Sequence, residues 1–139
     1  MSSYLGNKFS TQANELKKYN SNKFKKSYSL KHRIEESSRI REKYPDRCPV
    51  IVQKHYRSEN DVPDLDKTKY LVPSDLSVGQ LLYVIRKRMK LPCEKALYMF
   101  LGSGIMLATS ETMVNIYRNH RDDDNFVYFF FNTENTFGN

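Results

Sequence analysis

The chain has 139 residues, of which 39% are hydrophobic and 28% are charged, and its formal net charge is +7. This length fits one domain of roughly 100–200 residues, and the composition is that of a globular protein, not of a disordered or fibrous one. The longest strongly apolar run, residues 126–131, is far shorter than the ~18 residues that span a bilayer, and no stretch of signal-peptide type opens the chain, so any membrane attachment must use the surface or a covalent anchor.

The N-terminal part carries the excess of positive charge. Residues 1–47 contain 12 basic and 5 acidic residues, whereas the rest of the chain is neutral. Residues 1–22 are rich in Ser, Asn, Lys and Gln, which predicts a flexible basic extension. Such an arm could be attracted to nucleic acid, anionic lipid or an acidic filament, or it could be solvated only. The sequence leaves these alternatives open.

Residues 23–47 are predicted to form an N-terminal helical segment. A short turn over residues 24–27 precedes a helix over residues 30–42, a stretch without Pro or Gly that ends before Pro45. This helix has few apolar residues, so it is expected to lie on a surface and not inside a core.

Residues 48–132 are predicted to form the folded core. Residues 49–54 and 69–72 are strands, and Pro73 ends the second one. Ser77 and Gln80 make a capping box, which begins a helix with an apolar stripe of Val78, Leu81, Leu82, Ile85 and Met89. Residues 96–101 and 105–107 are predicted as strands joined by a turn at residues 102–104. A short helix over residues 112–120 and a last strand over residues 126–132 follow.

The predicted order of core elements is therefore ββαββαβ. This is the order of the α+β ubiquitin-like β-grasp, in which a mixed sheet packs on one long helix. The helical segment is an N-terminal addition to that fold, and residues 133–139 form a polar tail.

Residues of catalytic and metal-binding types do not cluster in the sequence. His32, His55 and His120 have no spacing for a nucleophile or a metal, and Cys48 and Cys93 are expected to be unpaired thiols. The glycines at residues 102–104 do not precede a helix, so they are not a phosphate-binding loop. The acidic run at residues 122–124 lacks the spacing of a calcium loop and is interpreted as a solvated turn. Nothing here predicts an enzyme, a metal site or a cofactor.

Long motifs at residues 42–52, 64–80 and 85–88, followed by the terminal Phe137-Gly138, resemble those of a known family. Residues 24–138 are similar to the autophagy ubiquitin-like modifiers, the family of GABA-receptor-associated protein and microtubule-associated light chain 3. The resemblance covers about four-fifths of the chain and implies the β-grasp fold predicted above.

The resemblance implies a protein that is conjugated to a lipid. A cysteine protease would remove Asn139 by cleaving after Gly138, with Phe137 recognised beside the cleavage site. Activating and conjugating enzymes would then join Gly138 covalently to phosphatidylethanolamine. The resemblance implies no other cofactor. The protein would be cytoplasmic and, after lipidation, attached to autophagosome or cytoplasmic vesicle membranes.

The resemblance also implies a site for receptor and adaptor peptides that carry an aromatic residue and an aliphatic residue three positions later. Such a peptide would add a strand to the sheet edge at residues 69–71. The pocket for the aromatic residue would be lined by Glu36, Ile40, Pro49, Ile51, Lys69, Leu71 and Phe126. The pocket for the aliphatic residue would be lined by Tyr70, Val72, Pro73, Leu76, Leu81, Val84 and Ile85. Acidic residues beside the peptide's aromatic would contact Arg47, Lys69 and Arg88.

The sequence departs from the family pattern in several places. Leu81 and Val84 replace larger residues, residues 102–108 lack the usual Asn-Asn and Pro-Pro pairs, and the loop at residues 56–63 is longer. These departures are expected to change peptide preference more than conjugation.

The alternative function is an unconjugated adaptor for microtubules or vesicle trafficking that acts through basic residues 8–33. Nucleic acid is not an expected partner, because the core is neutral and no strand interleaves aromatic and basic residues.

Overall fold

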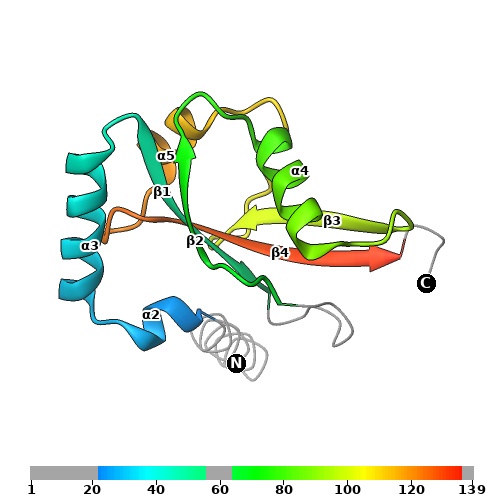
Figure 1. Cartoon of the computed structure of the whole chain (residues 1–139), viewed down its shortest axis with the longest axis horizontal. Helices are drawn as coiled ribbons and strands as arrows, with labels where there is room; N and C mark the ends of the chain where they lie inside the picture. Colours follow the sequence, from blue (N-terminus) through cyan, green and yellow to red (C-terminus); the bar gives the residue numbers. More distant parts are fainter. Residues whose placement is uncertain (1–21, 56–63, 136–139) are drawn as a thin grey trace, which may run out of the picture.

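The computed structural model describes residues 22–55 and 64–135. Residues 1–21 of the predicted extension, the loop at residues 56–63, and Phe137, Gly138 and Asn139 lie outside this range. The described elements, in chain order, are α2 (Lys23–Ser27), α3 (Leu30–Lys43), β1 (Arg47–Lys54), β2 (Lys69–Pro73), α4 (Val78–Met89), β3 (Lys95–Leu101), α5 (Met113–His120) and β4 (Val127–Asn135) (Figure 1). None of the helices in the described ranges is both long and apolar enough to cross a membrane.

The four strands form one mixed sheet in the order β2-β1-β4-β3. β1 pairs with β2 and β3 pairs with β4 in antiparallel fashion, while β1 and β4 run parallel. The last strand in the sequence therefore lies inside the sheet, and β2 and β3 are its two edges. This mixed sheet with helices packed on it confirms the predicted α+β β-grasp class.

α4 and α5 cover one face of the sheet and enclose the larger of two apolar clusters. Alternate residues of β1 and β4, such as Val50 and Phe129, point to this face and are buried with Leu81 and Ile85 of α4. The apolar stripe read from the sequence is thus the buried side of α4.

The start of α4 is fixed by the predicted capping box. Gln80 N–H donates to Ser77 Oγ at 3.2 Å, and Ser77 N–H donates to Gln80 Oε1 at 2.9 Å. Replacing Ser77 by Ala removes the acceptor, so we expect the free energy of unfolding to fall by about 1 kcal/mol in chemical denaturation. Ser38→Ala, an exposed position inside α3, is the matched control and should change it by less than half as much. Equal effects of the two variants would contradict the capping role.

α2 and α3 cover the opposite face of the sheet (Figure 1). The smaller apolar cluster lies there and contains Phe24, Ile51, Phe126, Tyr128 and Phe130, with Ile40 packed against it. The rings of Phe24 and Phe126 meet edge to face with centroids 5.3 Å apart. As expected, α3 lies on the surface of the molecule, because only polar residues, Arg33 and Ser37, are buried along it.

Two predictions about the core were wrong. Residues 105–107 form no strand, and only an isolated bridge joins Phe100 and Met106. The reason is that the chain turns towards α4, where Gly79 N–H donates to the Thr109 carbonyl at 2.9 Å. The core order is thus ββαβαβ. The acidic run is not wholly solvated either, because Asp124 is completely buried.

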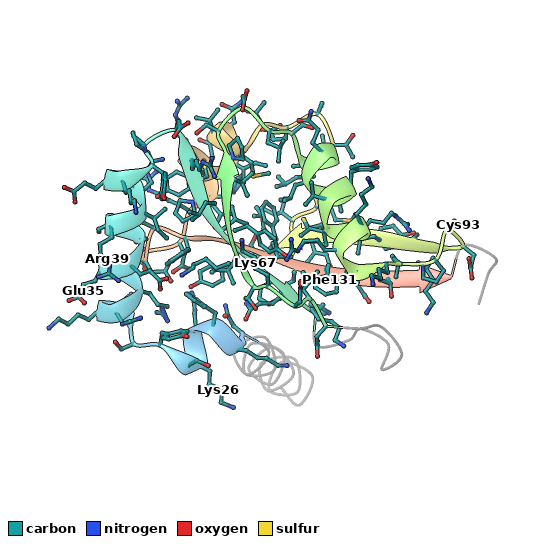
Figure 2. All side chains as sticks on the ribbon, viewed as in Figure 1. Lys26, Glu35, Arg39, Lys67, Cys93 and Phe131 are labelled. Carbon is teal, nitrogen blue, oxygen red and sulfur yellow. The ribbon has the colours of Figure 1, made fainter. Side chains whose placement is uncertain are left out.

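Smaller differences concern the bounds of elements. The turn at residues 24–27 is part of helix α2, and Asn22, assigned to the extension, is buried and caps that helix. β4 continues three residues beyond its predicted end, to Asn135, because it pairs with β3 as far as Lys95. Cys48 is buried, Cys93 is exposed (Figure 2), and neither forms a disulfide.

Candidate functional site

β2 is an edge strand whose outer backbone groups face away from the sheet. Val52 N–H donates to the Thr68 carbonyl at 2.9 Å, which makes this pair a hydrogen-bonded one. Since such pairs alternate in antiparallel sheets, Tyr70 and Val72 direct their backbone groups to β1, whereas Lys69 and Leu71 direct theirs outward. The outer edge of β2 therefore offers the N–H and C=O groups of two residues to another strand.

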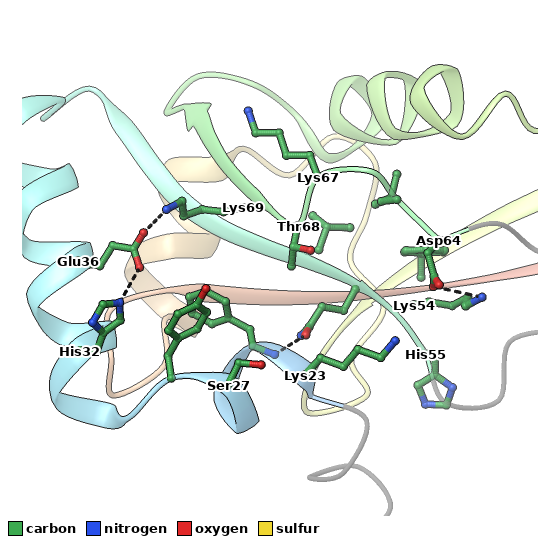
Figure 3. A pocket seen from close by; sticks show the side chains of 16 residues that line it. Lys23, Ser27, His32, Glu36, Lys54, His55, Asp64, Lys67, Thr68 and Lys69 are labelled. Carbon is green, nitrogen blue, oxygen red and sulfur yellow. Dashed lines mark hydrogen bonds and ion pairs between the residues drawn. The ribbon is translucent and has the colours of Figure 1, made fainter.

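The seven residues predicted for the aromatic pocket lie together on the α2–α3 face. Ile51 and Phe126 are completely buried, where they would form the floor of the predicted pocket, and Ile40 of α3 packs against them. Pro49 and Leu71 are paired on neighbouring strands. Glu36 of α3 forms an ion pair with Lys69 of β2 across the gap between helix and strand (Figure 3).

This ion pair borders a groove of about 870 Å³ between α2, α3 and the β1–β2 pair. His32 Nε2 lies 3.9 Å from Glu36 Oε2, and the imidazole stacks on the ring of Tyr28 at 5.0 Å between centroids. Among the described residues, four lysines and two carboxylates line the groove, so this part of its wall carries a net positive charge; the lysines are Lys23, Lys54, Lys67 and Lys69 (Figure 3). Of these lysines only Lys69 was predicted to line a binding site, since Lys23 and Lys54 are far from it in the sequence and no pattern connects them with Lys67.

Five of the seven residues predicted for the aliphatic pocket belong to the apolar cluster on the other face of the sheet, which α4 covers. Tyr70, Val72, Leu81 and Ile85 are buried there, and Leu76 is half-buried. Pro73 and Val84 are exposed. The two predicted pockets are thus on opposite sides of one edge strand.

Tyr70 is held between cations at the edge of this second cluster. Lys67 Nζ and the Arg88 guanidinium lie 5.4 and 5.8 Å from the centroid of its ring. Its hydroxyl is buried and makes no hydrogen bond within the described part of the chain. Burial raises the pKa of Tyr70, an effect that Arg88 partly opposes.

The three cations predicted to contact acidic peptide residues do not lie together. Lys69 pairs with Glu36 and Arg88 pairs with Asp66 at 3.2 Å, both near the beginning of β2. Arg47 lies opposite Pro73, at the other end of the strand. Four residues of extended chain separate the two ends, which is about 13 Å.

A buried polar cluster beneath the aromatic pocket was not predicted. Arg33 Nε of α3 lies 3.0 Å from Asp124 Oδ2, and the two side chains are 9% and 0% exposed. Asp124 also accepts hydrogen bonds from the Phe126 amide at 2.9 Å and from the Tyr128 hydroxyl. Burial raises the pKa of Asp124, and the hydrogen bond from Tyr128 opposes this effect. Among the described residues, no group of acidic, His or Cys side chains could hold a metal ion.

Comparisons with known proteins agree on one family. The family model described as "Autophagy protein Atg8 ubiquitin like" matches residues 32–138. "Autophagy-related protein 8a" of Arabidopsis thaliana is 55% identical over 115 residues, which is 83% of this chain and 92% of that protein. "Autophagy-related protein 8" of Mycosarcoma maydis is 52% identical over 83% of this chain and 95% of that protein. The crystal structure of Trypanosoma brucei ATG8 matches with a TM-score of 0.76 and 41% identity, and covers 84% of this chain and 98% of that one.

Proposed function

Because the chain belongs to the Atg8 family of autophagy ubiquitin-like proteins, we propose that it is conjugated to a membrane lipid and recruits short peptide motifs of autophagy receptors. The family and the fold are those of a ubiquitin-like modifier, not of an enzyme. Membership of this family implies association with autophagosomes. Lipid attachment and peptide recognition are proposed beyond that.

The geometry of β2 is the observation that carries the peptide-binding proposal. In an extended peptide, side chains three positions apart point to opposite faces and lie about 10 Å apart. A peptide paired with the outward groups of Lys69 and Leu71 would direct its aromatic residue to the α3 face and its aliphatic residue to the α4 face. Residues predicted for the two pockets lie on these two faces, which supports recognition of a motif with this spacing.

Charge supports the same proposal. The lysine-rich wall of the groove extends from Lys69, in the predicted aromatic pocket, to residues that precede β2 in the chain, such as Lys67. Acidic residues ahead of the peptide's aromatic residue would meet Lys69 and could exchange with its present partner Glu36. Exposed charge pairs contribute little affinity but select the partner and speed association.

Two variants at Leu71 test this mode of binding. Leu71→Pro removes an N–H that faces away from β1, so the sheet keeps its internal hydrogen bonds while the peptide loses one. We expect affinity for a synthetic Trp-x-x-Leu peptide to fall at least about 100-fold, as measured by isothermal titration calorimetry. Leu71→Ala, which keeps the N–H and trims the pocket wall, is the matched control and should lose about tenfold or less. Equal binding by the two variants would rule out pairing at this edge.

The conjugation proposal concerns residues beyond the described end of β4. Gly138 follows Asn135 by three residues, and the match to the family model extends to residue 138. A protease of the pathway would release Asn139, and the Gly138 carboxyl group would then form an amide with phosphatidylethanolamine through enzyme-bound thioesters. Two acyl chains anchor a protein stably, which would attach this chain to a membrane without a spanning helix.

A further inference from the structure

Four residues of α3 form the stripe that faces the sheet. Arg33, Glu36, Ser37 and Ile40 recur at intervals of three and four, the spacing that places side chains on one side of a helix. Glu36 and Ile40 belong to the aromatic pocket, whereas Arg33 and Ser37 are buried and contact Asp124. The same helix side thus supplies a wall of the pocket and the attachment of that wall.

Asp124 connects this helix with the floor of the pocket. Ser37 Oγ donates to the Asp124 carbonyl at 2.6 Å, and Arg33 pairs with the Asp124 carboxylate. One oxygen of that carboxylate accepts the amide of Phe126, the floor residue two positions later, and the other accepts the Tyr128 hydroxyl. A single buried residue therefore fixes both α3 and the beginning of β4.

Arg33 also holds α2 in place. Its guanidinium donates to the carbonyl of Lys25, which lies in α2, at 3.4 Å. It also donates to the carbonyl of Tyr28, the residue that follows α2, at 3.2 Å. α2 carries Phe24, whose ring packs on Phe126. The Arg33 contacts therefore reach the pocket floor from a second direction.

We propose that Arg33, Ser37 and Asp124 are positioning residues of the peptide site, which set the distance between α3 and Phe126 and thereby select a large aromatic side chain. They touch no peptide themselves. This inference rests on the proposed peptide-binding function. It predicts that loosening the cluster changes which side chain the pocket prefers, beyond any effect on folding.

The test compares two synthetic peptides that differ only in Trp or Leu at the aromatic position. We expect Arg33→Met to weaken binding of the Trp peptide about tenfold and to change binding of the Leu peptide less than about twofold. Arg39→Met, the same change on the exposed side of α3, is the matched control and should leave both dissociation constants unchanged. An equal loss for both peptides, or no loss for either, would overturn the inference.

Two further variants keep the test valid if Arg33→Met folds poorly. Arg33→Lys retains the positive charge and should restore most of the Trp preference, and Ser37→Ala should reduce that preference to a smaller extent than Arg33→Met. Folding of each variant is checked by far-ultraviolet circular dichroism at the titration temperature. If the unaltered chain binds neither peptide, the proposed function fails. If it binds the Trp peptide and the variants keep the same preference, only the positioning role fails.

Discussion

Cells that express the Gly138→Ala variant are expected to contain only the unconjugated protein. Glycine has no Cβ and adopts backbone angles closed to other residues, so it can enter a narrow enzyme channel that excludes alanine. Intact-mass spectrometry should show the unaltered chain without Asn139 and with the added mass of a phospholipid, and the variant without the lipid. Induction of autophagy by starvation should increase the lipid-bearing form of the unaltered chain alone.

A chain truncated after Gly138 is the control for this experiment. It already ends at the reactive carboxylate, so it should acquire lipid even in cells that lack the processing protease. Lipid on the Gly138→Ala variant would contradict the assignment of the reactive residue. An unaltered chain that keeps Asn139 and its full mass under starvation would instead favour the unconjugated adaptor, which acts through the basic N-terminal residues.

Replacing Arg33 by Met is expected to lower the free energy of unfolding by about 3–5 kcal/mol at neutral pH. The methionine fills similar space but leaves the Asp124 carboxylate buried without its cation. Removing one partner of a buried pair costs more than removing both, because the remaining charge is no longer compensated. The double variant Arg33→Met with Asp124→Asn should therefore be more stable than Arg33→Met alone, as urea denaturation can measure.

The pH dependence of this effect has a defined sign. Burial raises the pKa of Asp124, so the folded chain binds this proton more readily than the unfolded chain. The contribution of Asp124 to stability is therefore fully present below the ordinary carboxyl pKa and is lost as pH rises through the raised value. Without Arg33 that pKa should rise further. The deficit of Arg33→Met relative to the unaltered chain should thus be largest near pH 7 and shrink towards about pH 4. A deficit that stays constant over this range would show that lost packing, and not charge, causes it.

Local sequence patterns predicted those helices and strands that are specified by neighbouring residues. The capping residues Ser77 and Gln80 predicted the start of α4, and the run of β-branched residues around Ile51 predicted a buried strand. For both elements neighbouring residues contain the necessary information. The edge position of the strand at residues 69–73 was instead implied by the resemblance to the family, and the structure places that strand at the edge of the sheet.

Contacts between distant segments could not be predicted in this way. Asp124 stands in a run of three acidic residues, which is typical of a solvated turn, and its burial depends on a cation 91 positions earlier in the chain. Residues 105–107 have strand-like composition, but hydrogen bonds to α4 draw the chain that follows them away from β3. The predicted aromatic pocket lacked its lysine-rich extension for the same reason, since those lysines meet only when α2 and the β1–β2 pair are packed together.

The interior position of β4 determines when the protein can fold during translation. β1 and β3 do not touch each other, and each is joined to the sheet through β4, with Val50 opposite Val127 and Leu101 opposite Phe129. A nascent chain that still lacks its last strand holds only the β1–β2 hairpin, and an isolated two-stranded pair is marginally stable in water. The four-stranded sheet therefore assembles only after β4 has left the ribosome, and until then β3 has no strand to pair with in the described part of the chain.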